Sequence, residues 1–321
     1  MALTITTIDA LKKSATQYQK ELLIMPVTSA QATLQHMQGM PGLKGNLVLS
    51  EIYGEAELAP YKRTNVKDAE IGITARTLEM YLGNCAYNFD PNELWGTIYG
   101  SLVTQGEALK GVDINKSILM LATARMGKKL NMAIWNAKRN ADGSTTKDLF
   151  NGFDTITDSE KLSEGIKADK GNYLQLTEDI TEANAIDTFQ KIYDAASDEL
   201  QSQPVKIYCS KDIYSAYNRD YQLLHGALPY NTEFKKTYLE GTDGLWEFCP
   251  LASKKGSKYI HIAPQSNMIY GYGAGENPGE TLDLGKYAPW ALTLEASMAF
   301  GVQFKTISQE MLFVAELKAK E

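Results

Sequence analysis

The sequence predicts an α+β protein with one unusually long helix and one unusually long strand. Residues 114–139 place apolar side chains at helical spacing, and residues 292–304 alternate apolar and polar side chains. Residues 46–82 hold two short strand-like runs around a polar middle, the pattern of a hairpin. The chain therefore combines helical and strand patterns, and we expect an α+β fold.

Length and composition limit the classes of function. The chain has 321 residues, roughly two domains at about 150 residues each. Its 44% hydrophobic and 22% charged residues are those of a globular protein, so wholesale disorder is excluded. The formal net charge is −7, whereas a dedicated duplex-DNA binder needs a basic face.

Cysteine and histidine are too few and too scattered for a metal site or a disulfide framework. The three cysteines stand at positions 85, 209 and 249, and the three histidines at positions 36, 225 and 261. No cofactor or metal is therefore expected, and the cysteines suit a reducing compartment. No apolar run approaches the ~20 residues of a membrane span, and the N-terminus lacks a signal-peptide pattern. We expect a soluble protein that folds in the cytoplasm.

The N-terminal region predicts a helix followed by an arm. Apolar residues at spacings of three and four predict a helix over 7–25, with Thr7 as its cap and Pro26 ending it. Residues 26–45 are punctuated by proline and glycine, which predicts an extended arm rather than a packed domain.

The hairpin over residues 46–82 is expected to protrude, because its two strands flank a long polar tip at 55–65. An isolated two-stranded ribbon is marginally stable in water, so this one should lie on another surface. Two interpretations stay open: a surface hairpin on its own subunit, or a loop that lies on a neighbour.

The helix over residues 114–139 would be about 40 Å long at ~1.5 Å per residue. Asp113 or Asn115 can cap its start, and the polar run 140–144 stops it. Its charge is unusual, because seven basic residues and one acidic residue lie between Lys110 and Arg139, a net of +6.

The next region has the opposite charge. Residues 154–199 contain 12 acidic residues and four lysines, a net of −8. The elements expected here and just beyond are an amphipathic helix over 181–200, a strand over 205–209, a helix capped by Ser210, and strands over 258–263 and 268–272.

The C-terminal region has the clearest alternation in the chain. Seven apolar positions at period two predict a strand of about 13 residues over 292–304, against a usual length of ~5–6. A polar turn at 306–310 should lead to a last strand over 311–317.

No catalytic motif emerges. There is no phosphate-binding loop, no HExxH motif and no GxSxG elbow. The run Gly271–Glu276 begins like a dinucleotide fingerprint, but no helix follows it, which favours a glycine-rich turn. The acidic pairs Glu178–Asp179 and Asp198–Glu199 are more typical of surface charge than of acid–base catalysis. His261 is expected to be a half-buried structural residue rather than a catalytic base. A packing role in a core or interface is also favoured over base stacking for Tyr208, Tyr214, Tyr217 and Tyr221.

A long arm, a protruding hairpin, a long helix and a long strand suit a protein that reaches across its neighbours. In the order of these elements the chain resembles the major capsid proteins of tailed bacteriophages, whose Hong-Kong-ninety-seven-like fold is shared with encapsulins. The resemblance implies an N-terminal arm at 1–45, an E-loop hairpin at 46–82, a peripheral (P) domain at 83–153 and 282–321 with the spine helix at 114–139, and an inserted axial (A) domain at 154–281. No long extension that would act as a scaffold precedes the arm, so the scaffold is expected on a separate chain or already removed.

The resemblance implies a structural subunit, not an enzyme. Copies would self-assemble into pentamers and hexamers of an icosahedral head that encloses the double-stranded DNA genome, which places the chain in the virion. The implied partners are further copies of the chain, a separate scaffolding protein and a portal, with packaged DNA nearby but not read by sequence, and no membrane. Acids of the hairpin tip would meet the basic spine helix of the next subunit; the candidate contact residues are Glu55, Glu57, Lys62, Arg63, Arg125, Lys128 and Lys129.

Three alternatives stay open. An encapsulin-like shell would have the same fold and a cargo pocket on its inner wall. A carboxylate-based hydrolase would lose turnover when one acidic pair is mutated. A structural or binding protein outside the capsid class would stay monomeric.

Overall fold

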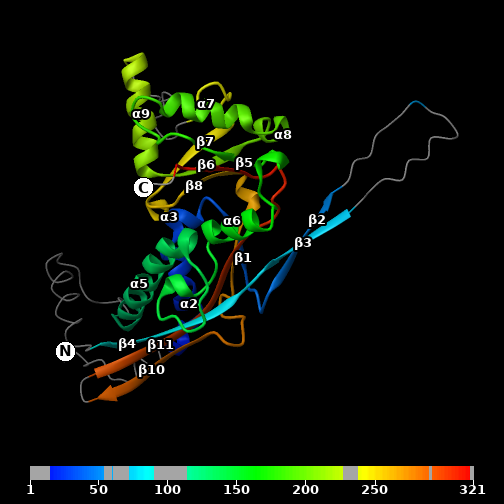
Figure 1. Cartoon of the computed structure of the whole chain (residues 1–321). Coiled ribbons are helices and arrows are strands. Elements are labelled where there is room, and N and C mark those ends of the chain that lie inside the picture. The colour runs from blue at the N-terminus through cyan, green and yellow to red at the C-terminus, as the bar shows by residue number, and fades with distance from the viewer. Residues whose placement is uncertain are drawn as a thin grey trace.

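Two five-stranded sheets and a long helix make up the body of the structure, and a two-stranded ribbon projects from it (Figure 1). The computed structural model describes residues 15–53, 60, 72–89, 114–226, 238–288 and 291–318. The helices of these residues are α2 (Gln19–Ser29), α3 (Gln31–Leu34), α5 (Ile114–Asn136), α6 (Phe153–Leu162), α7 (Ala185–Ala195), α8 (Asp198–Gln201) and α9 (Lys211–His225). The fold is α+β, as the sequence predicts.

The strands are named in chain order. They are β1 (Gln38–Pro41), β2 (Leu47–Tyr53), β3 (Gly72–Leu78), β4 (Tyr81–Phe89), β5 (Tyr173–Gln175), β6 (Val205–Ser210), β7 (Trp246–Leu251), β8 (Tyr259–Ala263), β9 (Met268–Tyr272), β10 (Thr281–Ala288), β11 (Ala291–Phe304) and β12 (Phe313–Glu316).

Strand β11 organises the first sheet, whose strand order is β1-β9-β11-β10 with β4 also paired to β11. Its first half is hydrogen-bonded to β10 on one edge and to β4 on the other, and its last residues pair with β9. The predicted long strand is therefore confirmed. It is long because it pairs with β10 and β4 over its first part and with β9 at its end. The predicted polar face is only partly solvated, because Glu295 is exposed but two of its hydroxyl residues are not. Thr293 and Ser297 are buried, and their hydroxyls donate to Asn88 and to the Gly279 carbonyl.

The second sheet has the order β5-β12-β8-β6-β7 and separates two apolar cores. Alternate residues of its strands point to opposite faces. Ile207 and Ile262 pack on one face with α7 and α9, while Tyr208 and Ala263 pack on the other with α5 and α6. The predicted strand over 205–209 and the Ser210 cap are confirmed, because the Ser210 side chain accepts a hydrogen bond from the Ile213 N–H.

Helices α2 and α5 cross in close contact, and this crossing corrects the prediction for the N-terminal region. The Thr7 cap and residues 7–14 of the predicted helix over 7–25 lie outside the described residues, and a turn at Tyr18 interrupts the rest. Pro26 does not end the helix that follows this turn; it lies inside α2, which runs on to Ser29. A proline inside a helix costs ~3 kcal/mol, but Leu22, Leu23 and Val27 on the same helix are buried, which offsets that cost. The approach is possible because residue 127 of α5 is glycine, where a Cβ would overlap the Pro26 carbonyl oxygen.

Residues 26–45 are not an extended arm. They form the end of α2, the short helix α3 and strand β1, which pairs in parallel with β9. Leu34 and Met37 are buried in the largest apolar core. Of the proline and glycine residues in this segment, only Gly42 and Gly45 lie in the turn between β1 and β2, whereas Pro26 lies inside α2 and Gly39 and Pro41 lie inside β1.

Other boundaries also differ from the sequence prediction. The predicted helix over 181–200 is two helices, α7 and α8, separated by an extended backbone at Ala196 and Ser197. The helix predicted over 114–139 is confirmed as α5, which ends at Asn136. Strands β4 and β7 and helix α6 had no clear pattern in the sequence.

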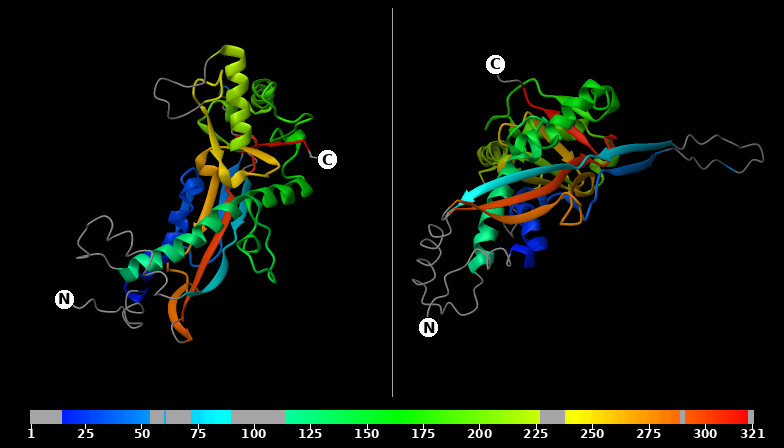
Figure 2. Two further views of the ribbon diagram at one scale, coloured as in Figure 1. Left: turned by 90° about the vertical axis from the view of Figure 1, so that its left-hand side faces the viewer. Right: turned by 90° about the horizontal axis from the view of Figure 1, so that it is seen from below.

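The ribbon of β2 and β3 is the described part of the predicted hairpin. The two strands pair antiparallel from Leu47 opposite Leu78 to Tyr53 opposite Gly72. They form a two-stranded sheet of their own, and the ribbon points away from the body in Figure 1 and in the right-hand view of Figure 2.

Replacement of Gly127 by alanine should lower the free energy of unfolding by about 1–3 kcal/mol, because α2 and α5 must separate to admit the methyl group. Gly285→Ala is the matched control, since no atom lies within 4 Å of a Cβ there. Urea unfolding followed by circular dichroism measures both. Equal stabilities of the two variants would contradict the role given to the helix crossing.

Candidate subunit interface

The Arg76 side chain on β3 bonds the base of the ribbon to the body of the protein. The Arg76 guanidinium on β3 donates to the Glu160 carboxylate on α6 at 2.7 Å and to the Gln303 side chain on β11 at 3.3 Å. The Gln303 amide in turn donates to the Thr77 carbonyl at 3.1 Å. Because the side chains of Arg76 and Glu160 are only 11% and 21% exposed, this ion pair is poorly screened by solvent.

The ribbon has one covered face and one uncovered face. Cross-strand partners share a face, so Leu49 and its partner Arg76 point to the body, and Leu49 is buried with Leu78 and Ile269. The opposite face carries Val48 and Ile73, which are 60% and 68% exposed. Apolar β-branched side chains in the open on an isolated ribbon mark a surface suited to contact with another protein.

Helix α5 presents three predicted site residues to solvent. Arg125, Lys128 and Lys129 are exposed and lie within two turns of the helix, on either side of the buried Gly127. No ion pair joins any of the three to another residue in the described part of the chain. The structure therefore leaves a basic patch at the centre of α5, which we define as Arg125, Lys128 and Lys129.

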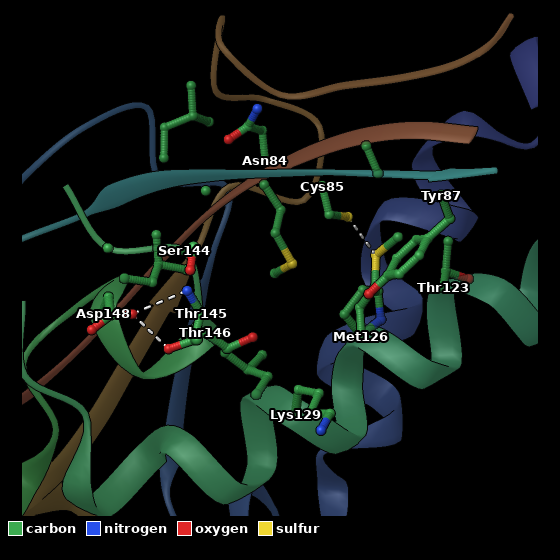
Figure 3. A pocket seen from close by; sticks show the side chains of 18 of the residues that line it. Asn84, Cys85, Tyr87, Thr123, Met126, Lys129, Ser144, Thr145, Thr146 and Asp148 are labelled. Carbon is green, nitrogen blue, oxygen red and sulfur yellow. Dashed lines mark hydrogen bonds between the residues drawn. The ribbon is translucent and has the colours of Figure 1, made fainter. Parts of the chain in front are cut away.

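A cavity of about 380 Å³ adjoins this basic patch (Figure 3). It lies between β4, α5 and the turn over 139–149, and Lys129 forms part of its wall. On one side the thiol of Cys85 donates to the Met126 sulfur at 3.5 Å. On the other, Asp148 accepts hydrogen bonds from the Thr145 backbone N–H and hydroxyl, which lowers the pKa of Asp148. The wall is therefore mixed, with apolar sulfur groups facing a polar turn.

The remaining predicted site residues, Glu55, Glu57, Lys62 and Arg63, lie outside the described residues. The structure brings Arg125, Lys128 and Lys129 together on one helix, while the pairing of this patch with the hairpin tip stays a prediction.

The glycine-rich run after β9 is a turn, as predicted, and it holds a carboxylate of the chain itself. The Glu280 carboxylate accepts the N–H of Gly275 at 2.6 Å and the N–H of Ala299 at 2.8 Å. The Glu280 carboxylate thus occupies the space beside these two backbone N–H groups. No helix follows the turn, so the run lacks the strand–turn–helix arrangement of a dinucleotide-binding fingerprint.

The acidic pairs and the tyrosines are placed as the sequence favoured. Glu178–Asp179 and Asp198–Glu199 are exposed. Tyr208 and Tyr217 are fully buried, one in each of the two apolar cores that the second sheet separates.

Sequence reasoning missed a buried polar cluster, which we define as Asp154, Lys254 and His261. The Lys254 ammonium lies 3.5 Å from Asp154 and 2.8 Å from Nδ1 of His261. The prediction that His261 is half-buried is wrong, because its side chain is fully buried. A histidine inside the otherwise apolar strand β8 was the one sequence signal that polar side chains lie beside it. Lys254 and Lys255 precede a glycine and look like a surface turn in the sequence.

Within the described residues, no group of three or more His, Cys, Asp or Glu side chains is placed to hold a metal ion. Among the same residues, no helix is both long enough and apolar enough to span a membrane.

Comparison with known proteins identifies the fold. No protein-family model and no curated protein matches the sequence. Among solved structures, a capsid of a native GTA particle has 11% identity and a TM-score of 0.58, covering 90% of this chain and 91% of its own. A satellite phage P4 procapsid with its size determination protein has 9% identity and a TM-score of 0.58, with 99% and 92% covered. The cyanophage A-1(L) capsid has 13% identity and a TM-score of 0.53, with 91% and 92% covered.

The chain therefore has the fold of phage capsid proteins. The likeness extends over nearly the whole chain and nearly the whole of each capsid protein. The capsid fold that the order of elements in the sequence predicts is therefore confirmed.

Replacement of Arg76 by methionine should lower the free energy of unfolding by about 1–3 kcal/mol, because it leaves Glu160 partly buried without its cation. It should also speed amide hydrogen exchange in β3 more than in β8. Lys20→Met is the control, since the Lys20–Glu276 pair is exposed and its loss should cost ~1 kcal/mol or less. Unchanged exchange in β3 would contradict the fastening role of Arg76.

Proposed function

We propose that the chain is the major capsid protein of a tailed phage, a structural subunit that assembles into pentamers and hexamers of an icosahedral head around double-stranded DNA. The observation that carries the proposal is the match of about nine-tenths of the chain to capsid structures that share only 9–13% of its residues. A shared architecture at such low identity fits a function that depends on shape.

The uncovered ribbon face supports self-association. A two-stranded ribbon gains little stability alone, and here two large apolar side chains, Val48 and Ile73, are left in water. A second copy that covers this face would bury both residues. Each such contact would contribute a modest binding free energy, and a closed shell would contain many of these contacts.

The proposal includes a domain assignment. Residues 83–153 and 282–321 would be the P domain with α5 as its spine helix, 154–281 the A domain and 46–82 the E-loop, while the N-terminal segment 1–45 is packed over 26–45 and is not proposed as an extended arm there. Strand β12 pairs with β5 and β8, so its hydrogen bonds would tie the C-terminal end of the P domain to the A-domain sheet.

Charge would guide the contact between subunits. The acids of the hairpin tip, Glu55 and Glu57, would meet the basic patch on α5 of a neighbouring copy, while Lys62 and Arg63 would contact its acidic groups. The basic patch supports this step because its three residues are exposed and unpaired within the described chain. The contact would weaken as salt is raised.

The remaining partners follow from a capsid role. A separate scaffolding protein and a portal would join the shell, assembly would take place in the host bacterial cytoplasm, and the product would be the virion. Packaged DNA would lie close by without sequence-specific binding. The exposed acidic residues within 154–199 would face one surface of the shell.

A structural role also accounts for the acidic pairs. Glu178–Asp179 and Asp198–Glu199 are exposed and are absent from the walls of three well-formed cavities of the described residues. This arrangement supports a non-enzymatic protein over a carboxylate-based hydrolase, since burial is what tunes catalytic carboxyl groups. No observation favours the encapsulin-like shell over the phage head.

The full chain, expressed and purified, should form hollow shells or rings of five and six subunits in negative-stain electron microscopy, with matching species in sedimentation velocity. A chain that stays monomeric over the accessible concentration range would contradict the proposal. Shells that retain a co-purified enzyme would instead indicate a cargo compartment.

Reversal of the basic patch, Arg125→Glu with Lys128→Glu and Lys129→Glu, should abolish most particle formation while the chain stays folded by circular dichroism. The reversal places acids opposite the acids of the hairpin tip. Particle yield by sedimentation is the measurement.

The matched control reverses three other exposed lysines, Lys170, Lys255 and Lys305, and so makes the same change in net charge. Equal particle yields from the two triple variants would contradict the electrostatic contact but not the capsid role itself.

A further inference from the structure

The buried polar cluster joins three elements that are far apart in the sequence. Asp154 lies in the first turn of α6, Lys254 in the short 3-10 helix Ala252–Lys254, and His261 in β8. The side chains of Asp154 and Lys254 are 8% and 1% exposed, and that of His261 is fully buried. A lysine is seldom enclosed so completely, and its amine here faces a carboxyl oxygen at 3.5 Å.

The walls of the cluster are aromatic. The Lys254 nitrogen lies 3.8 Å from the centre of the Trp135 ring, and the His261 ring stacks on Phe304 at 5.7 Å between centroids. Ionised groups are costly in such surroundings. Burial lowers the pKa of Lys254 to about 8 and raises the pKa of Asp154, so both shifts are toward the uncharged forms that the two groups need to react.

The hydrogen bonds around His261 leave its Nδ1 as the acceptor. The Thr157 hydroxyl donates its proton to the Phe153 carbonyl at 2.8 Å, so its oxygen accepts from Nε2–H of His261 at 2.9 Å. The other ring nitrogen, Nδ1, then carries no proton and points at the Lys254 nitrogen at 2.8 Å. A proton acceptor is thus in direct contact with the amine.

We propose that Lys254 and Asp154 are a modification site at which an intramolecular isopeptide bond forms. The Lys254 nitrogen attacks Cγ of the protonated Asp154 carboxyl, and the new N–C bond forms. Nδ1 of His261 takes a proton from that nitrogen and passes it to the hydroxyl of the carboxyl group. The C–O bond breaks and one water molecule leaves, so no oxidant or other reactant is needed.

The product suits the site better than the reactants do. The amide carries no charge, so the cost of holding two ionised groups in an aromatic pocket disappears. Its N–H can still donate to Nδ1 of His261. The bond would join residues 100 positions apart and link α6 to the 3-10 helix between β7 and β8, and its formation is independent of shell assembly.

The intact mass of the wild-type full chain under denaturing conditions tests the proposal. The expected mass is lower than that of the sequence by one water molecule, and a digest should contain one branched peptide that includes both Asp154 and Lys254. A mass equal to that of the sequence, with or without its initial Met, would overturn the proposal. So would a water loss that maps to Asp142–Gly143, where a succinimide can form.

Two variants sharpen the result. Asp154→Asn should lose ammonia instead of water and so reach the same final mass as cross-linked wild type. Lys254→Arg should show the full mass of its sequence. If Lys254→Arg fails to fold, the branched peptide of the wild-type chain still decides the outcome, because an ion pair leaves no covalent trace.

His261→Gln tests the proton transfer. The variant should stay folded by circular dichroism and yield a cross-linked fraction at least tenfold lower than wild type at equal times after synthesis. A fraction equal to that of wild type would remove His261 from the reaction.

Discussion

The hydrogen bonding of β11 on both edges is the constraint on which the rest of the structure depends. Residues 292–297 pair with β4 and β10 at the same time, and residues 300–304 pair with β9. A shift of register by one residue would turn every side chain to the opposite face. Leu292 and Leu294 would then leave the core against α2, and Phe300 and Phe304 would leave the core against α6. The register of β11 therefore holds in place the core against α2 and the core against α6.

The packing of α5 on α2 decides which residues remain for contact with other molecules. Gly127 lets the two helices meet, which turns Arg125, Lys128 and Lys129 away from the contact and into solvent. Arg76 does the same for the ribbon, because it draws the face of Leu49 to the body and leaves Val48 and Ile73 exposed. The surfaces offered to a neighbour are thus consequences of internal packing.

Charge has two different roles in this chain. Exposed charges are segregated into the basic patch of α5 and the acidic residues around 154–199, an arrangement that the net charge of −7 conceals. Buried charges, by contrast, are drawn together with partners. Asp154, Lys254 and His261 satisfy one another inside an aromatic shell, where neither the lysine nor the aspartate would be stable alone.

The sequence by itself determined the elements whose patterns are local: the period of 114–139, the alternation of 292–304, the hairpin strands and the Ser210 cap. The order of these elements also predicted the capsid fold. Only the tertiary structure decided that Pro26 lies within a helix, that residues 26–45 are packed, and that Lys254 is buried beside Asp154. The physical reason is the same in each case. Propensity and periodicity act over a few residues, whereas burial against α5, β9 and β8 joins residues that are distant in the chain and outweighs the local preference.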